Sequence, residues 1–136
     1  MLPRTREEVL SAISDWVEKL NGERGKTVVI VEGTKDEVSL INIGVELPVV
    51  HLNKGMSILD LMETLKRRDR PFEDLEPFEK VVVLTDWDRT GGRLAYRIKE
   101  TCRGLGIQCD LEWRKELSRI TRKWIRDVES LDSLFK

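Results

Sequence analysis

The stretch Val81-Val82-Val83-Leu84-Thr85-Asp86-Trp87-Asp88-Arg89-Thr90-Gly91-Gly92 decides the fold. It opens with four apolar residues, the pattern of a short strand buried on both faces, and continues into acids and glycines. A second stretch has the same form, because Val28-Val29-Ile30-Val31 is followed by Glu32-Gly33-Thr34-Lys35-Asp36. Two predicted strands therefore end in carboxylates, and each is followed by a glycine that favours a turn.

Periodicity along the rest of the chain predicts strands that alternate with helices. Thr5 and Glu8 form a capping-box pattern, and Ser57 is a typical N-cap of a further helix. Alternation of this kind predicts an α/β fold with a parallel sheet of about four strands and helices on both faces. We expect a single domain over 1–136, with its core at about 26–111. The predicted strands are 26–31, 48–52, 80–84 and 107–111. The predicted helices are 34–43, one that begins at 57, 90–102 (ending near Gly104), and the terminal helices 6–20 and 113–130.

Composition narrows the class of protein. The 136 residues include 24 basic and 25 acidic side chains, a net charge of -1, which excludes a strongly basic nucleic-acid coat and an acidic tail. No apolar run is long enough for a membrane span, and the N-terminus lacks the apolar core of a signal peptide. Two cysteines and one histidine argue against a zinc site. These features predict a cytoplasmic protein with reduced thiols and no membrane contact.

The acids at the strand ends are the candidate site. Residues two apart in an extended chain point the same way, so Asp86 and Asp88 can face one point, and Glu32 can join them if the two strands are neighbours. Three converging carboxylates repel one another unless a cation neutralises them, and oxygen ligands suit Mg²⁺ or Mn²⁺. The alternative is that strand-end aspartates cap the following helices, with Asp88 the clearest candidate.

Both stretches resemble the acidic motifs of Toprim domains, and the resemblance runs over about residues 26–111. Toprim domains occur in topoisomerases, primases, nucleases and ribosomal-RNA maturases, and the likeness is to small stand-alone members that are primase-like or maturase-like. The resemblance implies a Rossmann-like fold and Mg²⁺ held by Glu32, Asp86 and Asp88. It also implies that Glu32 serves as general acid or base in phosphodiester chemistry.

Several neighbours of these acids are candidates for substrate contact. The glycines would let the backbone approach a phosphate, or would serve only a tight strand-to-helix turn. Trp87 is expected to point away from the two aspartates and to be exposed at the site. The candidate substrate-binding residues are Gly33, Lys35, Asp36, Arg89, Gly91 and Arg93.

Basic residues gather apart from the acids. Six lie between Trp113 and Arg126, and Arg89, Arg93, Arg97 and Lys99 follow the second motif. A basic surface beside a metal site is what a nucleic-acid backbone requires, although a solvated helix face gives the same pattern. The sequence thus predicts a Mg²⁺-dependent protein that processes RNA or DNA. Two alternatives stay open: a non-catalytic nucleic-acid-binding module of a larger complex, and a phosphatase of the haloacid-dehalogenase type with Asp86 as nucleophile.

Overall fold

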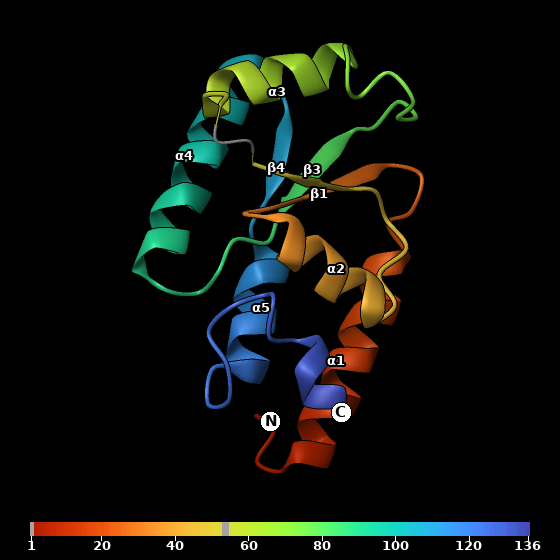
Figure 1. Cartoon of the computed structure of the whole chain (residues 1–136), viewed down its shortest axis with the longest axis vertical. Coiled ribbons are helices and arrows are strands. Elements are labelled where there is room, and N and C mark those ends of the chain that lie inside the picture. The colour runs from red at the N-terminus through yellow and green to blue at the C-terminus, as the bar shows by residue number, and fades with distance from the viewer. Residues whose placement is uncertain (1, 53–54) are drawn as a thin grey trace.

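Four parallel strands form one sheet through the middle of the molecule (Figure 1). The structure is a computed structural model that describes residues 2–52 and 55–136. The strands lie in the order β2-β1-β3-β4, and each neighbouring pair is parallel. The predicted α/β fold with a four-stranded parallel sheet is confirmed. The strands are β1 (Thr27–Val31), β2 (Val49–His51), β3 (Lys80–Val83) and β4 (Gln108–Asp110).

Helices cover both faces of this sheet. Helices α3 and α4 pack on one face, against Val28, Ile30, Val81 and Val83, while α1, α2 and α5 pack on the other. Within the described residues, no helix is long and apolar enough to cross a membrane. The helices are α1 (Arg6–Asn21), α2 (Thr34–Asn42), α3 (Ile58–Arg67), α4 (Arg89–Leu105) and α5 (Glu112–Thr121), and a short 3₁₀ helix, η1 (Asp132–Phe135), lies near the C-terminus.

Local sequence explains where these helices begin and end. The hydroxyl oxygen of Thr5 accepts the backbone N–H of Glu8 at 3.1 Å, and Ser57 accepts that of Asp60 at 3.0 Å, so both predicted N-caps are confirmed. Helix α4 runs past Gly104, its expected end, to Leu105. It stops there because Gly106 adopts the left-handed conformation, with φ of 71°, that ends many helices.

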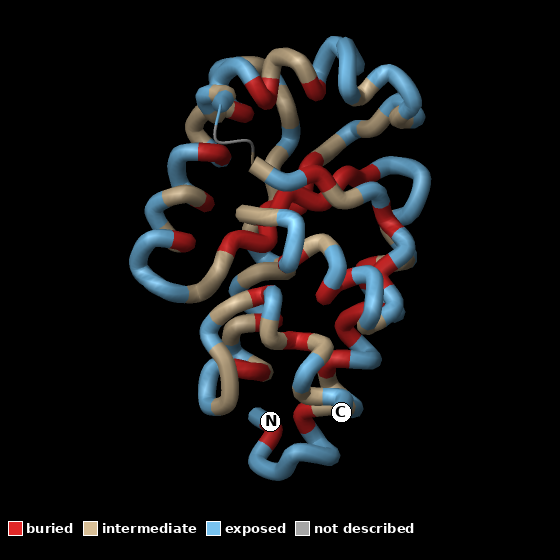
Figure 2. The backbone as a smooth tube through the Cα atoms, in the orientation of Figure 1, coloured by how far each residue is buried: buried red, intermediate tan, exposed pale blue. Residues whose placement is uncertain are grey.

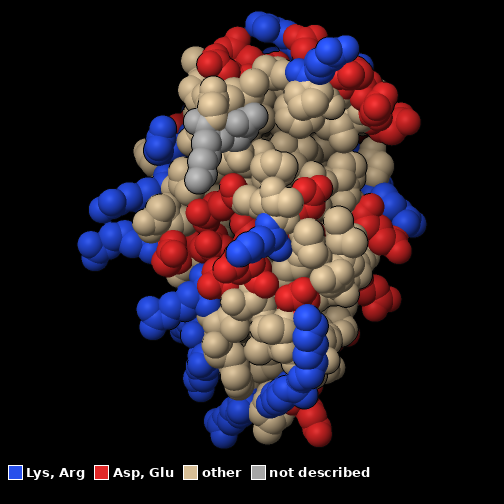
Figure 3. All heavy atoms as spheres, viewed as in Figure 1, with Lys and Arg blue, Asp and Glu red and all other residues tan. Residues whose placement is uncertain are grey.

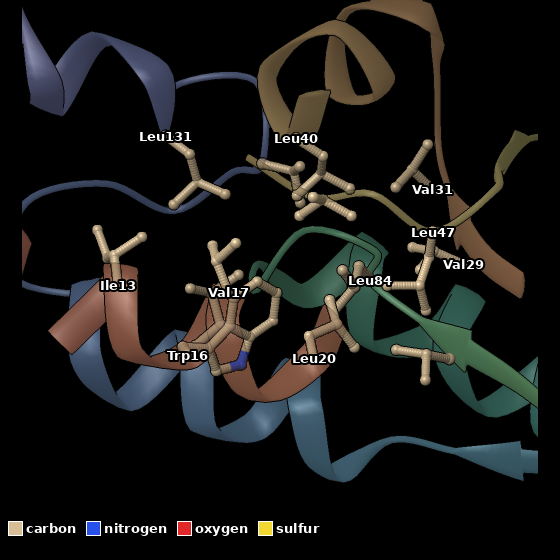
Figure 4. Close-up of a cluster of buried hydrophobic side chains, with 14 of the residues drawn as sticks. Ile13, Trp16, Val17, Leu20, Val29, Val31, Leu40, Leu47, Leu84 and Leu131 are labelled. Atoms are coloured by element: carbon tan, nitrogen blue, oxygen red, sulfur yellow. The ribbon is translucent and has the colours of Figure 1, made fainter. Parts of the chain in front are cut away.

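The larger hydrophobic core lies between the sheet and α1. Buried residues concentrate along the strands and on the inward sides of the helices (Figure 2). Figure 4 shows side chains of α1, including Trp16 and Leu20, meeting Val29 of β1 and Leu84. Trp16 is 1% exposed, and its indole N–H donates to the carbonyl oxygen of Trp113 in α5 at 3.0 Å. This core holds α5 rigidly against the sheet.

The C-terminal helix expected over 113–130 is wrong in its second half. Helix α5 ends at Thr121, and the chain then folds into turns. The residues that follow make hydrogen bonds with the loop after β3, which is distant in sequence, and these contacts outweigh the helical periodicity. Val128 is nevertheless fully buried, so the apolar spacing correctly indicated burial although it did not indicate a helix.

Candidate functional site

The two acidic stretches meet where the strand order of the sheet reverses. Strand β1 lies between β2 and β3, so the chain passes from β1 to β2 at one side and then crosses to β3 at the other side. Such a switch point, at the carboxyl ends of the strands, is where open α/β sheets bind ligands. The backbone N–H of Leu84 donates to the carbonyl oxygen of Ile30 at 2.8 Å. The strand ends that carry Glu32 and Asp86 are therefore adjacent, as the metal-site prediction required.

Glu32 and Asp86 are joined through the backbone. The Oε2 atom of Glu32 accepts the N–H of Asp86 at 2.7 Å, and Oδ1 of Asp86 accepts the N–H of Val128 at 2.9 Å. Each bond engages one oxygen, and a carboxylate has a second oxygen to offer a cation. Hydrogen bonds of this kind orient metal-binding carboxylates in proteins.

Burial and the surrounding acids raise the pKa of Asp86 to about 7. Burial is the largest cause, and the nearby charges of Glu32, Asp36 and Asp127 add to it, against the opposing effect of the Val128 N–H. Figure 3 shows Asp and Glu side chains gathered in the middle of the face onto which these loops open. The site concentrates negative charge in partly buried surroundings, and this combination favours the binding of a cation.

Asp36 belongs to the same acidic group, although its immediate contact is structural. Its Oδ2 accepts the N–H of Gly33 at 2.9 Å, which fixes the start of α2. Burial, opposed by this Gly33 N–H, raises the pKa of Asp36, and the charges of Glu32, Glu129 and Asp127 raise it further. Asp127 and Glu129 come from the segment after α5, and no motif in the sequence indicated that they would face the site.

One cation of the chain is built into this acidic region. The guanidinium of Arg114, on α5, donates from Nε to the carbonyl oxygen of Thr85 at 2.9 Å and from Nη2 to that of Asp86 at 2.7 Å. Burial lowers the pKa of Arg114, against the opposing charges of Asp88, Glu32 and Asp86, and an arginine stays charged at neutral pH in any case. Sequence reasoning placed Arg114 only in a general basic cluster.

Asp88 lies differently from the other two predicted ligands. Its Oδ1 accepts the N–H of Gly91 at 2.7 Å, which makes it the N-cap of α4, and the residue is exposed. The capping alternative considered for Asp88 is therefore the arrangement found. In the described part of the chain, no group of three or more His, Cys, Asp or Glu side chains is disposed to hold a metal ion. Glu32 and Asp86 are together, and Asp88 is turned to the helix.

Trp87 is not exposed at the site as expected. It is half-buried against the core on the α1 side of the sheet. Its indole N–H donates to the carbonyl oxygen of Ile125 at 2.9 Å, and its backbone N–H donates to that of Arg126 at 3.0 Å. Trp87 thus ties the loop after β3 to the segment after α5, and this segment forms a wall of the site.

The remaining candidates fall into two groups. Lys35, Arg89 and Arg93 are exposed and free to meet a ligand. Gly91 is buried, and a Cβ atom there would lie 1.8 Å from the carbonyl oxygen of Asp86. Its glycine identity is therefore explained by packing against the acidic loop, whereas at Gly33 the nearest atom to such a Cβ is Oδ2 of Asp36 at 4.0 Å.

A hollow of about 260 Å³ adjoins Glu32. Arg97 of α4 lines it, together with apolar side chains of α3 and α4 such as Ile58 and Leu94. The hollow brings a basic residue of α4 to the same opening as the Glu32 carboxylate. The donors at the site, all carboxylates, are of the kind that Mg²⁺ takes together with water and substrate oxygens. The chemistry of the donor set thus fits a divalent cation, and Glu32 and Asp86 are the residues that would meet it.

Comparison with known proteins places these features in a family. The sequence model of the Toprim domain family matches residues 27–120. A UPF0292 protein of Thermococcus gammatolerans is 36% identical over 121 residues, which cover 89% of this chain and 81% of the relative. The UPF0292 protein of Methanocaldococcus jannaschii is 34% identical over 128 residues, 94% of this chain and 93% of the relative. A solved structure of a protein from Aquifex aeolicus superposes with a TM-score of 0.67 at 26% identity, covering 94% of this chain and 99% of that one.

Proposed function

This chain belongs to the Toprim family, as a relative of the archaeal UPF0292 proteins, and from that premise we propose that it hydrolyses or transfers phosphodiester bonds of RNA or DNA with Mg²⁺ or Mn²⁺. Family membership indicates a metal-dependent function connected with nucleic acids, and Toprim domains generally bind Mg²⁺. The reaction, the residues that perform it and the nucleic-acid substrate are the proposal.

The observation that carries this proposal is the contact between Glu32 and Asp86 at the switch point of the sheet. Each carboxylate holds a backbone N–H with one oxygen, at 2.7 and 2.9 Å respectively, so neither side chain turns freely. More acids surround the pair than Arg114, the half-buried cation at this site, can neutralise. A site that keeps this charge imbalance is suited to a divalent cation and to the phosphate that accompanies it.

The residues would divide the work by position. A divalent cation, when bound, would polarise a phosphoryl oxygen and acidify a water molecule. Asp86 and Glu32 would hold the cation, and Asp88 would join them through its other carboxylate oxygen, since only Oδ1 caps α4. Glu32 would accept the proton of the attacking water or hydroxyl as the new phosphorus–oxygen bond forms, and would return a proton to the leaving oxygen as the old bond breaks. Arg114 would keep the acidic loop in place through its hydrogen bonds to the carbonyl oxygens of Thr85 and Asp86.

A nuclease panel tests the proposal. Single- and double-stranded RNA and DNA are incubated with the protein and Mn²⁺ or Mg²⁺, and we expect cleavage that stops with EDTA and in Glu32→Gln. Glutamine keeps an oxygen that accepts the Asp86 N–H, so this variant removes the charge and not the contact. Glu18→Gln, an exposed acid on the distant face of α1, is the matched control and retains activity. Absence of metal-dependent cleavage, or its persistence in Glu32→Gln, contradicts the proposal.

A binding module without catalysis is the second candidate. The observation that favours it is the role of Asp88 as a helix cap, which leaves the site short of a third converging ligand. Such a module would bind nucleic acid in a salt-sensitive manner and cleave none of the panel. The phosphatase alternative is weakened by membership of the Toprim family, and turnover of a small phosphate ester that Asp86→Asn abolishes would restore it.

A further inference from the structure

The outward face of α4 carries a row of arginines that have no acidic partner among the residues the structure describes. Arg89, Arg93 and Arg97 recur every four residues, which sets them about 6 Å apart along the helix axis and on one side of it. All three are exposed, and none of their guanidinium groups forms a salt bridge or hydrogen bond with another described residue. The opposite side of α4 is buried through Gly91, Ala95, Ile98 and Cys102.

An exposed aromatic ring lies within this row. Tyr96 is 60% exposed, and as the residue seven positions after Arg89 it falls on the same side of the helix. Its hydroxyl donates to Oε1 of Glu100 at 3.1 Å, which anchors the edge of the ring and leaves its faces open. Glu100 also pairs with Arg103 at 3.4 Å, so the arginine near the end of α4 has an acidic partner, unlike the three arginines of its first half.

The row continues beyond α4. Arg122, Lys123 and Arg126 follow α5, are exposed, and form no salt bridge with the described residues. The carbonyl oxygen of Arg126 accepts the N–H of Trp87, so this segment lies directly against the acidic loop. Figure 3 shows Lys and Arg side chains in a column along the edge formed by α4 and this segment, beside the cluster of acids.

We infer that the outward face of α4 binds a single-stranded nucleic acid and directs it toward Glu32, an inference that rests on the proposed function. The arginine row is Arg89, Arg93 and Arg97, with Tyr96 as the base-stacking ring and Arg122, Lys123 and Arg126 as its extension. Positive side chains that follow the backbone, with aromatic rings on which bases stack, are the combination that holds single strands without reading sequence. Arg97 also lines the hollow that opens at Glu32, which joins the row to the site. A duplex, whose bases are stacked within the helix, would make no use of Tyr96.

Binding is measured apart from cleavage. Fluorescein-labelled single-stranded DNA and RNA of about 12 nucleotides, and a DNA duplex of the same length, are titrated in EDTA while anisotropy is followed over a range of salt concentrations. We expect the single strands to bind more tightly than the duplex. Arg93→Gln/Arg97→Gln should weaken single-strand binding and lower its salt slope by about 2, one for each arginine that no longer meets a phosphate. Tyr96→Ala should weaken it about fivefold or more, while Tyr96→Phe, which keeps the ring, retains it.

The control removes the same charge elsewhere. Lys115→Gln/Arg119→Gln takes two exposed basic residues, also four apart, from the side of α5 that faces α1, and we expect single-strand affinity close to that of the parent. Thermal unfolding confirms that each variant is folded. An equal loss in this control, unchanged binding in the α4 variants, a preference for duplex, or no binding at all overturns the inference.

If the α4 variants lose binding and the parent cleaves nothing, the inference stands and the proposed reaction fails. If cleavage depends on Glu32 and the α4 variants bind normally, the proposed reaction stands and the inference about α4 fails.

Discussion

The two ends of β3 treat charge in opposite ways. At its start, the ammonium group of Lys80 forms salt bridges with Oε1 of Glu23 at 3.0 Å and with Oδ2 of Asp110 at 3.5 Å. Burial works against the charged ammonium, but these two carboxylates outweigh it and raise the pKa of Lys80. Beyond its other end, burial and neighbouring acids raise the pKa of Asp86 to about 7. The charges at the start of the strand stabilise one another, and those beyond its end oppose one another.

This difference indicates that the charges at the start of β3 stabilise the fold, whereas those beyond its end serve a ligand. A protein gains nothing in stability from carboxylates that repel each other, so the unneutralised end is where a ligand of opposite charge is expected. The neutralised end needs no ligand. Removing a charged side chain at the two ends should therefore change the free energy of unfolding in opposite directions, with a loss at Lys80 and a gain at Asp86.

The largest effect is expected where the backbone supports the acidic loop. Gly91→Ala would place a Cβ atom 1.8 Å from the carbonyl oxygen of Asp86, and relieving that overlap must displace the loop or the start of α4. We expect a loss of about 3 kcal/mol in the free energy of unfolding, measured by urea denaturation. Gly92→Ala is the matched control, because its nearest neighbour is the flexible end of Arg114 at 3.8 Å.

The neighbouring glycine should respond in the opposite direction. Alanine has a higher helix propensity than glycine, so Gly92→Ala should leave stability unchanged or raise it by up to about 1 kcal/mol. Similar losses in the two variants would show that the close approach of Gly91 to the Asp86 backbone is not what requires glycine.

A smaller loss is expected at the neutralised end. Lys80→Met keeps most of the apolar length of the side chain but leaves Glu23 and Asp110 without their shared cation. The free energy of unfolding should fall by about 1–2 kcal/mol at low salt and by less at high salt, because these groups are partly exposed. Unchanged stability at low salt would mean that the ion pairs at this end contribute nothing.

An effect of opposite sign is expected at Asp86 in EDTA. Between its ordinary pKa of 3.8 and its folded pKa of about 7, the folded protein binds a proton that the unfolded chain releases. Stability contributed by this group therefore falls as pH rises through that window. Asp86→Asn, which keeps an acceptor for the Val128 N–H, should be more stable relative to the parent near pH 8 than near pH 4. An identical difference at both pH values, by thermal unfolding, contradicts the raised pKa.

The sequence predicted the sheet and two of the acids for the same physical reason. Runs such as Val81–Leu84 suit only a strand buried on both faces, and parallel strands bring Glu32 and Asp86 to one edge. The two-residue spacing of Asp86 and Asp88 suggested Asp88 as a third ligand, but Asp88 directly precedes α4 and caps this helix. Local pattern describes both roles equally well, and only the surroundings decide between them.

The site residues from α5 and from the segment after it could not be predicted. Arg114 and Val128 reach the site through contacts with Thr85 and Asp86, which are separated from them by 28 or more positions. Apolar periodicity continues past Thr121, so it favoured a longer helix. The chain instead leaves the helix because the carbonyl groups of Ile125 and Arg126 bind Trp87. Tertiary contacts of this kind carry no local signal.

The central claim is that the acids beyond β1 and β3 bind a divalent cation. Isothermal titration of the metal-free protein with Mg²⁺ and Mn²⁺ tests it directly, at pH values on either side of about 7. We predict binding that strengthens as pH rises, because Asp86 must lose its proton, and that is lost in Glu32→Gln and Asp86→Asn but kept in Glu18→Gln. No heat of binding for either metal, or binding that survives in both site variants, would contradict the account.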